Sequence, residues 1–180
     1  LWTQDSSYRL PPHNWVPSFN PVLAPDGRVL LPASGGRVLE RASADAATGA
    51  LRTLVFYGDA AYDAAPASFD STVFINTPLT SDRQGNVFFG FTVSGSNPAN
   101  LTGGIARLGA DGSARWVRVA DVAGDATMVK TATNSAPALS NDERTLYVVV
   151  NGSGTRAAGR LLALDADTLS ARASVVLIDP

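Results

Sequence analysis

The residues with the clearest chemical potential are a single histidine and the polar groups near it. His13 stands in "RLPPHNWVPSF" and is the only histidine of a chain that contains no cysteine. Any Ser-His-Asp triad would therefore have to use His13, with Asp5 as the nearest acidic partner in sequence. One histidine without cysteine cannot supply the several nitrogen or sulfur ligands of a zinc site, so we expect no metal there.

The segment around His13 holds its polar groups on a backbone stiffened by prolines. Asn14 and Trp15 follow the histidine directly. Trp15 could pack the segment against the neighbouring strands, which is the commoner role of an aromatic residue, or it could stack against a ligand. The segment is therefore either an aromatic plug or part of a binding site.

Aspartate recurs in the short turns of the chain. Carboxylates suit hard cations, so a ring of these residues could bind one. However, no stretch has the alternating D-x-D-x-D-G order of a compact calcium loop, and an aspartate can cap its own turn by bonding the backbone two residues on. We therefore expect turn capping, and no metal or catalytic role, for Asp26, Asp45, Asp82, Asp111, Asp142, Asp165 and Asp167.

A repeat along the chain indicates which elements hold these residues. The phrases "FNPVLAPDGRVLLP", "NTPLTSDRQGNVFFGF" and "SAPALSNDERTLYVVV" place Pro21, Pro78 and Pro137 at one phase. In each phrase, a short strand after the proline leads through a polar turn into an apolar run, which is typical of a hairpin. Such phasing favours a repeat architecture.

Each unit then continues in the same order with two more strands. The third strands are "GRVLERAS", "GGIARLG" and "GRLLALD", and the fourth are "ALRTLVFY", "ARWVRVA" and "ARASVVLI". Helical periodicity is scarce, so we expect negligible helix. Four antiparallel strands per unit predict an all-β fold of about three β-propeller blades. The alternative is a β-sandwich in which the three similarities are accidental.

The third unit resembles the repeat of the pyrroloquinoline-quinone-like, or quinoprotein-type, β-propellers. That family's "L-x-A-L-D-x-x-T-G" strand and turn is matched by Leu162, Ala163, Leu164, Asp165 and Thr168. In the second unit, Trp116 sits where the repeat often carries a tryptophan, whereas the first unit lacks one. Leu169 departs from the pattern, because glycine is usual there.

The resemblance implies a propeller and, as one possible function, a fragment of a quinoprotein-type dehydrogenase. Such enzymes usually display a vicinal cysteine pair and a calcium-binding acidic cluster near the quinone. Because this chain contains no cysteine, we expect no cofactor. A second alternative is a propeller hydrolase or lyase with an axial active site that includes His13.

The repeat also sets the expected organisation of the chain. Residues 1–19 end a preceding blade and add a loop, residues 20–76 form the first blade with a long connection, and residues 77–134 and 135–180 form the second and third blades. Three blades are fewer than a closed propeller needs, so we expect further blades from the same or another chain to complete it. The expected core comprises Val22, Leu23, Val29, Leu30, Val87, Phe88, Phe89, Leu146, Val148 and Val150.

Composition narrows the classes of partner and the location. A formal net charge of -2 and a pI near 5.2 provide no basic excess for binding phosphates, so we expect no nucleic-acid partner. No apolar run is long enough for a membrane helix, and the start lacks the pattern of a signal peptide. Abundant alanine, and arginine in place of lysine, are typical of a bacterial source. The location that we expect is extracytoplasmic, either secreted or periplasmic.

The longest loops should share one face of such a propeller, opposite the tight Asp-Gly turns. Long loops on a rigid scaffold are where binding residues concentrate. We therefore expect a non-catalytic module that binds a protein or glycan partner, with no catalytic residue assigned. The candidate binding residues are His13, Asn14, Trp15, Asn76, Asn97, Asn134 and Asn151.

Overall fold

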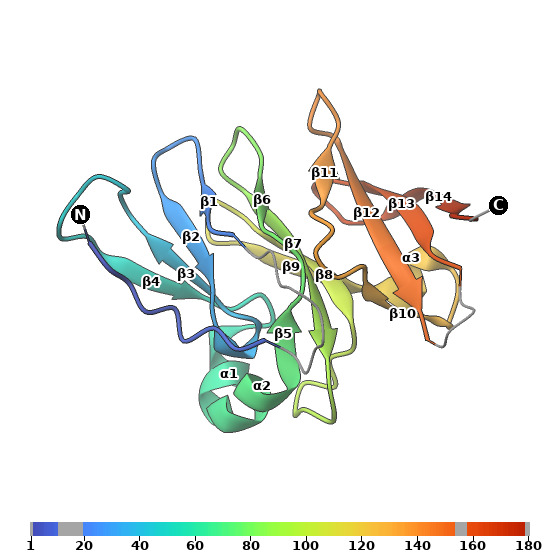
Figure 1. Cartoon of the computed structure of the whole chain (residues 1–180), viewed down its shortest axis with the longest axis horizontal. Coiled ribbons are helices and arrows are strands. Elements are labelled where there is room, and N and C mark those ends of the chain that lie inside the picture. The colour runs from blue at the N-terminus through green and yellow to red at the C-terminus, as the bar shows by residue number, and fades with distance from the viewer. Residues whose placement is uncertain (1, 11–19, 154–157, 179–180) are drawn as a thin grey trace.

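Three antiparallel β-sheets follow one another along the chain. The computed structural model of the protein describes residues 2–10, 20–153 and 158–178. Sheet one contains four strands, and sheets two and three contain five each. Figure 1 shows the sheets arranged side by side in chain order. The expectation of a mostly β structure built from three antiparallel units is confirmed.

The strands of each sheet follow the order expected from the sequence. Sheet one contains β1 (Val22–Leu23), β2 (Val29–Pro32), β3 (Val38–Arg41) and β4 (Leu51–Leu54). Sheet two contains β5 (Val73–Ile75), β6 (Thr80–Ser81), β7 (Val87–Val93), β8 (Gly104–Leu108) and β9 (Ala114–Arg118). Sheet three contains β10 (Met128–Thr131), β11 (Ala138–Leu139), β12 (Thr145–Gly152), β13 (Arg160–Asp165) and β14 (Ala171–Val176).

The first strand of sheets two and three is interrupted. β5 and β6 both pair with β7, and β10 and β11 both pair with β12. Sheet two therefore begins at Val73 and sheet three at Met128, within ranges that the sequence assigned to the preceding units. The second segment of each interrupted strand follows Pro78 or Pro137, whose missing N–H removes one ladder hydrogen bond.

Turn capping is confirmed for Asp26, Asp82, Asp111, Asp142 and Asp165, but within the described part of the chain no such cap is seen for Asp45 or for Asp167, whose carboxylate lies beside Arg107. Asp82 accepts hydrogen bonds from the backbone N–H of Asn86 at 2.8 Å and from its side-chain amide at 2.6 Å. Asp165 accepts from the backbone N–H of Thr168 at 2.8 Å and from the Arg172 guanidinium at 2.6 Å. These bonds hold the pKa of Asp165 well below its ordinary value, with the Thr168 N–H as the largest cause.

Successive strand residues point to opposite faces, so each sheet has two faces with different neighbours. We call the face toward the next sheet along the chain the forward face, and the opposite one the backward face. In sheet one, strand pairing gives a forward face that includes Leu30, Val38 and Leu54. In sheet two, the forward face includes Phe88, Ile105 and Val117. The same register gives sheet three a forward face that includes Tyr147, Leu161 and Val175.

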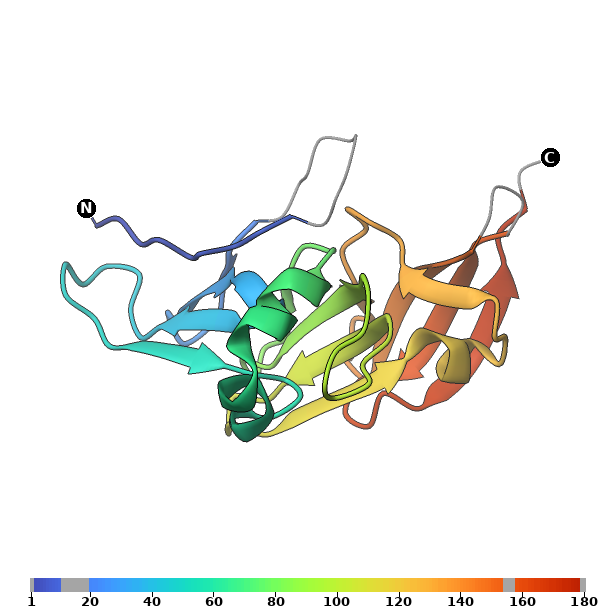
Figure 2. The same cartoon turned by 90° about the horizontal axis from the view of Figure 1, so that it is seen from below.

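Two apolar layers separate the three sheets. Between sheets one and two, Leu30 and Val38 pack with Phe89 and Phe91. Between sheets two and three, Phe88 packs in a largely aliphatic layer with Ile105, Leu146, Val148, Leu162 and Leu164. Fully burying one such side chain contributes about 1.5–3 kcal/mol, so these layers are the main source of stability. Figure 2 shows the sheets as successive layers.

Most of the expected core residues are buried, and one prediction was wrong. Leu23 is 63% exposed, because β1 is an edge strand and Leu23 lies on the outer, backward face of sheet one. Val22 and Val29 are partly buried. The remaining seven expected core residues are all buried, namely Leu30, Val87, Phe88, Phe89, Leu146, Val148 and Val150.

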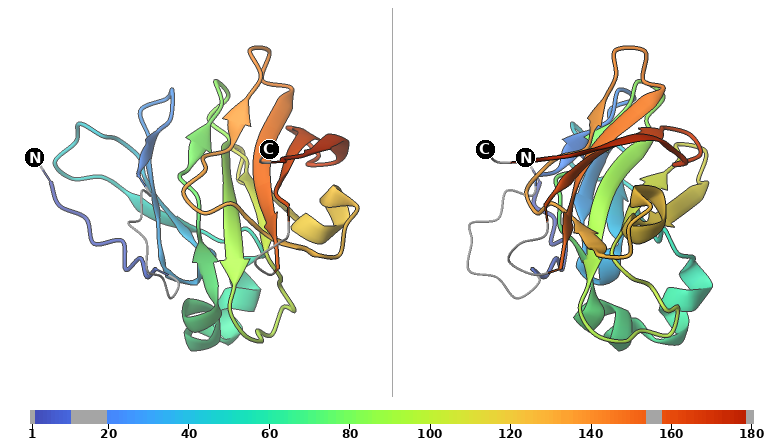
Figure 3. Two further views of the ribbon diagram at one scale, coloured as in Figure 1. Left: turned by 45° about the vertical axis from the view of Figure 1, so that its right-hand side comes forward. Right: turned by 90° about the vertical axis from the view of Figure 1, so that its right-hand side faces the viewer.

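Three short α-helices occupy connections that the sequence did not mark as helical. They are α1 (Asp59–Ala64), α2 (Pro66–Thr72) and α3 (Val119–Ala123), and a single turn of 3-10 helix, η1, spans Ser34–Gly36. Figure 3 shows α1 and α2 at the end of the molecule opposite the tight hairpins. Phe69 of α2 is fully buried and stacks on Tyr57 at 4.6 Å between ring centroids. Helices this short gain their stability from tertiary packing, which sequence periodicity does not reveal.

Candidate functional site

Three of the predicted binding residues cannot be placed. His13, Asn14 and Trp15 lie outside the residues that the structure describes. The interpretations of this segment as an aromatic plug or as a binding loop therefore both remain predictions.

Asn76, the fourth of the predicted binding residues, lies inside the protein and links sheets two and three. Its exposed fraction is 0%. Its side-chain amide donates to the carbonyl of Thr131 at 3.0 Å, and its side-chain carbonyl accepts from the Thr131 hydroxyl at 2.7 Å. Because both ends of the side chain are used between the sheets, Asn76 supports the fold and offers no group to an external ligand.

The other predicted asparagines also hold backbone positions. Asn97, 7% exposed, accepts from the N–H of Leu101 at 2.9 Å and donates to the carbonyl of Leu101 at 3.1 Å, which closes its own loop. Asn134 has a φ of 66° and donates its backbone N–H to the carbonyl of Asn76 at 3.1 Å. Asn151 is half-buried in β12, opposite Lys130. The structure thus brings Asn76 and Asn134 together, while Asn97 serves a separate loop.

A polar cleft lies at the other end of the sheets, where the tight hairpins meet. We call it the turn-end cleft, and its volume is about 260 Å³. It is lined by Asp82, Gln84, Asn86, Arg107, Glu143, Ala166 and Asp167, which come from hairpins of sheets two and three and from β8. Its volume is a little below the range of about 300–1,000 Å³ that is usual for small-molecule sites.

A chain of hydrogen bonds fixes the wall of the turn-end cleft. Asp82, only 5% exposed, orients Asn86 through the two bonds of the turn cap. The Asn86 side-chain carbonyl in turn accepts from Arg107 Nη2 and from the backbone N–H of Ala110, both at 3.1 Å. Arg107 is therefore held by a buried network rather than by solvent, and its guanidinium has a defined position.

Carboxylates flank this guanidinium on the side of sheet three. Asp167 Oδ1 lies 3.4 Å from Arg107 Nη2, and the Asp167 side chain is 82% exposed. Glu143, whose side chain is 16% exposed, accepts from the backbone N–H of Arg83 at 3.0 Å. Glu143 has a φ of 57°, a conformation that only a few per cent of non-glycine residues adopt. The strained turn presents its carboxylate toward sheet two.

One donor of the cleft is unused. Arg107 Nε is buried and has no hydrogen-bond partner among the described residues. Such buried, unsatisfied donors are uncommon, because each costs about 1–3 kcal/mol. A ligand cannot reach this buried atom, so the cleft offers it the fixed guanidinium of Arg107, the exposed carboxylate of Asp167 and the exposed side chain of Gln84. This arrangement is suited to hydrogen-bonding a polar molecule.

Sequence reasoning treated the hairpin residues of this cleft only as turns. "SDRQGN" and "SNDERT" each showed a hairpin signal, and Gln84 and Glu143 were not singled out. Both residues have long polar side chains at turn positions where no side-chain cap is needed, and this pattern could have marked them as candidates for binding. Within the described ranges, no group of three or more histidine, aspartate or glutamate side chains is placed to hold a metal ion.

Comparison with protein-family models, with curated proteins and with solved structures finds no match to this chain. The residues of the turn-end cleft and their hydrogen bonds therefore carry the functional argument. Among the described helices, none has the length and apolar character needed to cross a membrane.

Proposed function

We propose that the chain is a β-propeller-type binding module that holds a glycan in the turn-end cleft. The observation that carries this proposal is the fixed Arg107 guanidinium, which lines the cleft beside the exposed Asp167 carboxylate at 3.4 Å. Neighbouring sugar hydroxyls both donate and accept hydrogen bonds. One hydroxyl would donate to Asp167 while its neighbour accepts from Arg107.

Several features support the propeller part of the proposal. Each unit is a four-stranded antiparallel meander, with the first strand split in two units, and successive units stack face to face. The turn from Asp165 to Ser170 carries the pattern that resembles the quinoprotein-type repeat, and Leu169 adopts a φ of 57° where that repeat usually has glycine. Leu169 thus has a backbone conformation that favours glycine, and its side chain, 0% exposed, adds apolar contact.

The chemistry of the cleft favours binding over covalent catalysis. Both flanking carboxylates lie beside arginines, Asp167 beside Arg107 and Glu143 beside Arg83 at 3.6 Å. Charge-assisted contacts of this kind orient carboxylates as hydrogen-bond acceptors. Gln84 adds an amide, and Arg107 a donor, so the cleft matches a neutral ligand that carries several hydroxyl groups.

Titration with sugars tests the proposal. We expect neutral mono- and oligosaccharides to bind at millimolar or lower concentration in calorimetry or ligand-observed NMR, and Asp167→Asn and Gln84→Ala each to weaken binding at least several-fold. Asp121→Asn is the matched control, because Asp121 forms a similar exposed ion pair, at 3.9 Å from Arg118, outside the cleft. Absence of sugar binding, or binding unchanged in both cleft variants, would contradict the proposal.

A further inference from the structure

The forward face of sheet three repeats the positions that are buried in the other two sheets. Strand pairing places Leu30, Phe88 and Tyr147 at one equivalent position. Leu30 and Phe88 are each 1% exposed, whereas Tyr147 is 39% exposed. Val175 of β14 is 55% exposed, although its counterparts Leu54 and Val117 pack against apolar layers. The same face that is covered in sheets one and two is thus open in sheet three.

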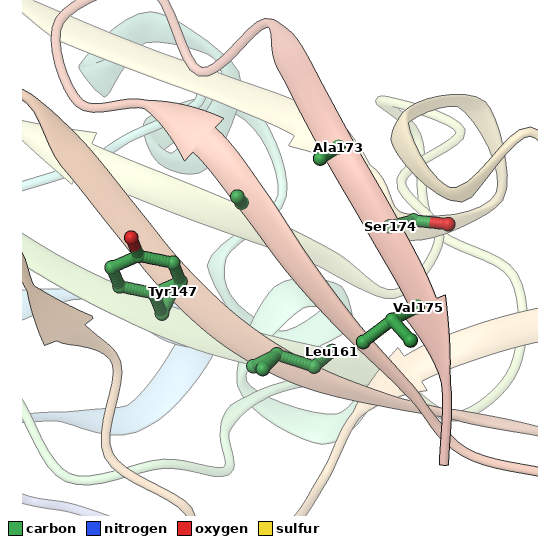
Figure 4. A pocket seen from close by; sticks show the side chains of 6 residues that line it. Tyr147, Leu161, Ala173, Ser174 and Val175 are labelled. Atoms are coloured by element: carbon green, nitrogen blue, oxygen red, sulfur yellow. The ribbon is translucent and has the colours of Figure 1, made fainter.

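A shallow apolar hollow marks this open face. It has a volume of about 220 Å³, and Figure 4 shows it between β12, β13 and β14. Its lining residues are Tyr147, Leu161, Ala163, Ala173, Ser174 and Val175.

The hollow has a sequence origin. Ala163 and Ala173 are paired across β13 and β14. The equivalent pairs are Glu40 with Arg52 in sheet one and Arg107 with Arg115 in sheet two. Charged side chains therefore occur at this place in the other sheets, and alanines replace them in sheet three. The open face of sheet three is therefore more apolar at this place than the covered faces of sheets one and two, and an exposed apolar patch marks an interaction surface.

The opposite end of the stack presents the complementary kind of surface. On the backward face of sheet one, Leu23 is 63% exposed and Leu51 is 45% exposed, on the two edge strands. Between them, β3 is buried, with Leu39 at 7% and Arg41 at 5% exposed, and the Trp2 ring lies 4.2 Å from the Arg41 guanidinium carbon, so the open part of this face is at its two edges. Val29 and Leu31 of this face are half-buried, whereas the residues at the same positions of sheets two and three are buried.

We propose that the forward face of sheet three binds the backward face of sheet one in a second copy of this chain. A forward face already packs on a backward face twice within each chain, so the contact between copies continues an existing type of interface. The two faces differ, which makes the contact head-to-tail, and such contacts close into a ring or extend as a chain. The exposed leucines of one copy would fill the alanine-lined hollow of the other.

Sedimentation equilibrium over a range of protein concentration tests this contact directly. We expect masses that are multiples of 18.7 kDa, with the multimer favoured as concentration rises. Val175→Glu, on the forward face of sheet three, and Leu51→Glu, on the backward face of sheet one, should each weaken association more than tenfold. Ala67→Glu is the control, because Ala67 is exposed on α2 and lies outside both faces.

Mixing the two variants distinguishes a head-to-tail contact from a symmetric one. Each variant keeps one intact face, so an equimolar mixture of Val175→Glu and Leu51→Glu should recover a 1:1 complex. A strictly monomeric protein at all concentrations would overturn the proposal. It would also be overturned if Leu51→Glu left association unchanged while Val175→Glu abolished it, since sheet three would then pair with itself.

A second pair of substitutions guards against loss of folding. The double variant Ala163→Glu/Ala173→Arg fills the hollow with the charged pair that sheet one has at Glu40 and Arg52, whose charged atoms lie 3.0 Å apart, and so leaves no space there for the leucines of a second copy. It should remain folded by circular dichroism and yet be monomeric; a folded double variant that associates like the unaltered chain would count against the contact. None of these measurements uses a sugar, so failure of this proposal can be distinguished from failure of the proposed function.

Discussion

The two contacts between neighbouring sheets use the same positions of the repeat but different chemistry. The contact between sheets one and two is aromatic, with Phe56 placed 4.4 Å from Phe91 and 5.8 Å from Phe89 between ring centroids. The contact between sheets two and three is largely aliphatic and contains the buried bridge between Asn76 and Thr131. Either aromatic or aliphatic side chains can thus form the apolar layer between two sheets, whereas the polar groups differ from one contact to the other.

Each contact also has its own device for fixing the relative position of the sheets. In the first, Arg28 binds Glu40 of its own sheet and donates to the carbonyl of Gly85 in sheet two at 3.0 Å. In the second, Gly90 lets the sheets approach closely, because a Cβ there would lie 2.1 Å from the Thr131 hydroxyl oxygen. Apolar packing is non-directional, so hydrogen bonds and steric fit must set the register between sheets.

The largest expected effect comes from two adjacent phenylalanines that face different contacts. Phe89 faces sheet one and Phe88 faces sheet three, and they are 0% and 1% exposed. We expect Phe88→Ala and Phe89→Ala each to lower the free energy of unfolding by about 3–5 kcal/mol. Phe89→Ala should cost more, because rigid aromatic neighbours fill a cavity less readily than aliphatic side chains.

Chemical denaturation of both variants measures this difference. Val129→Ala, at an exposed site, serves as the reference for a small loss. A change below about 1 kcal/mol for either phenylalanine would show that its side chain is not buried between sheets.

An intermediate effect is expected from the polar bridge of the second contact. Asn76→Ala leaves the Thr131 hydroxyl and carbonyl without these partners in a buried place, so the free energy of unfolding should fall by about 2–3 kcal/mol. Asn141→Ala, at an exposed turn, should change it by less than about 0.5 kcal/mol. Equal effects of the two substitutions would show that Asn76 does not link the sheets.

The smallest effect is expected at the rim of the second contact, from the turn cap formed by Asp165. Its pKa is held below the ordinary value of about 3.9, so the ionised carboxylate stabilises the fold above about pH 4. That contribution is lost as the pH falls further toward the folded-state pKa. Asp165→Asn should cost about 1 kcal/mol at pH 7.

Unfolding curves measured between pH 2 and pH 7 check the sign of this linkage. The difference in stability between the unaltered chain and Asp165→Asn should shrink on acidification. A difference that stays constant over this range would mean that ionisation of Asp165 does not stabilise the turn.

The strands, the turns and their order were predictable from the sequence because their causes are local. Apolar runs rich in β-branched and aromatic residues define β7 and β12, and aspartates such as Asp82 and Asp165 cap the hairpins with their own side chains. Each of these interactions joins residues that are close in the chain. The succession of three antiparallel sheets follows from the same local signals, but β5 and β10 fall in ranges that the sequence assigned to the preceding units.

The site and the exposed faces depended on the tertiary structure. Asn76 reads as a polar loop residue, but the packing of sheet three against sheet two buries it beside Thr131. The turn-end cleft forms only because hairpins of different units meet there. Likewise, Phe88 and Tyr147 occupy equivalent positions, and only the presence or absence of a covering sheet makes one buried and the other exposed. Burial is a property of neighbours distant in sequence, which local patterns do not specify.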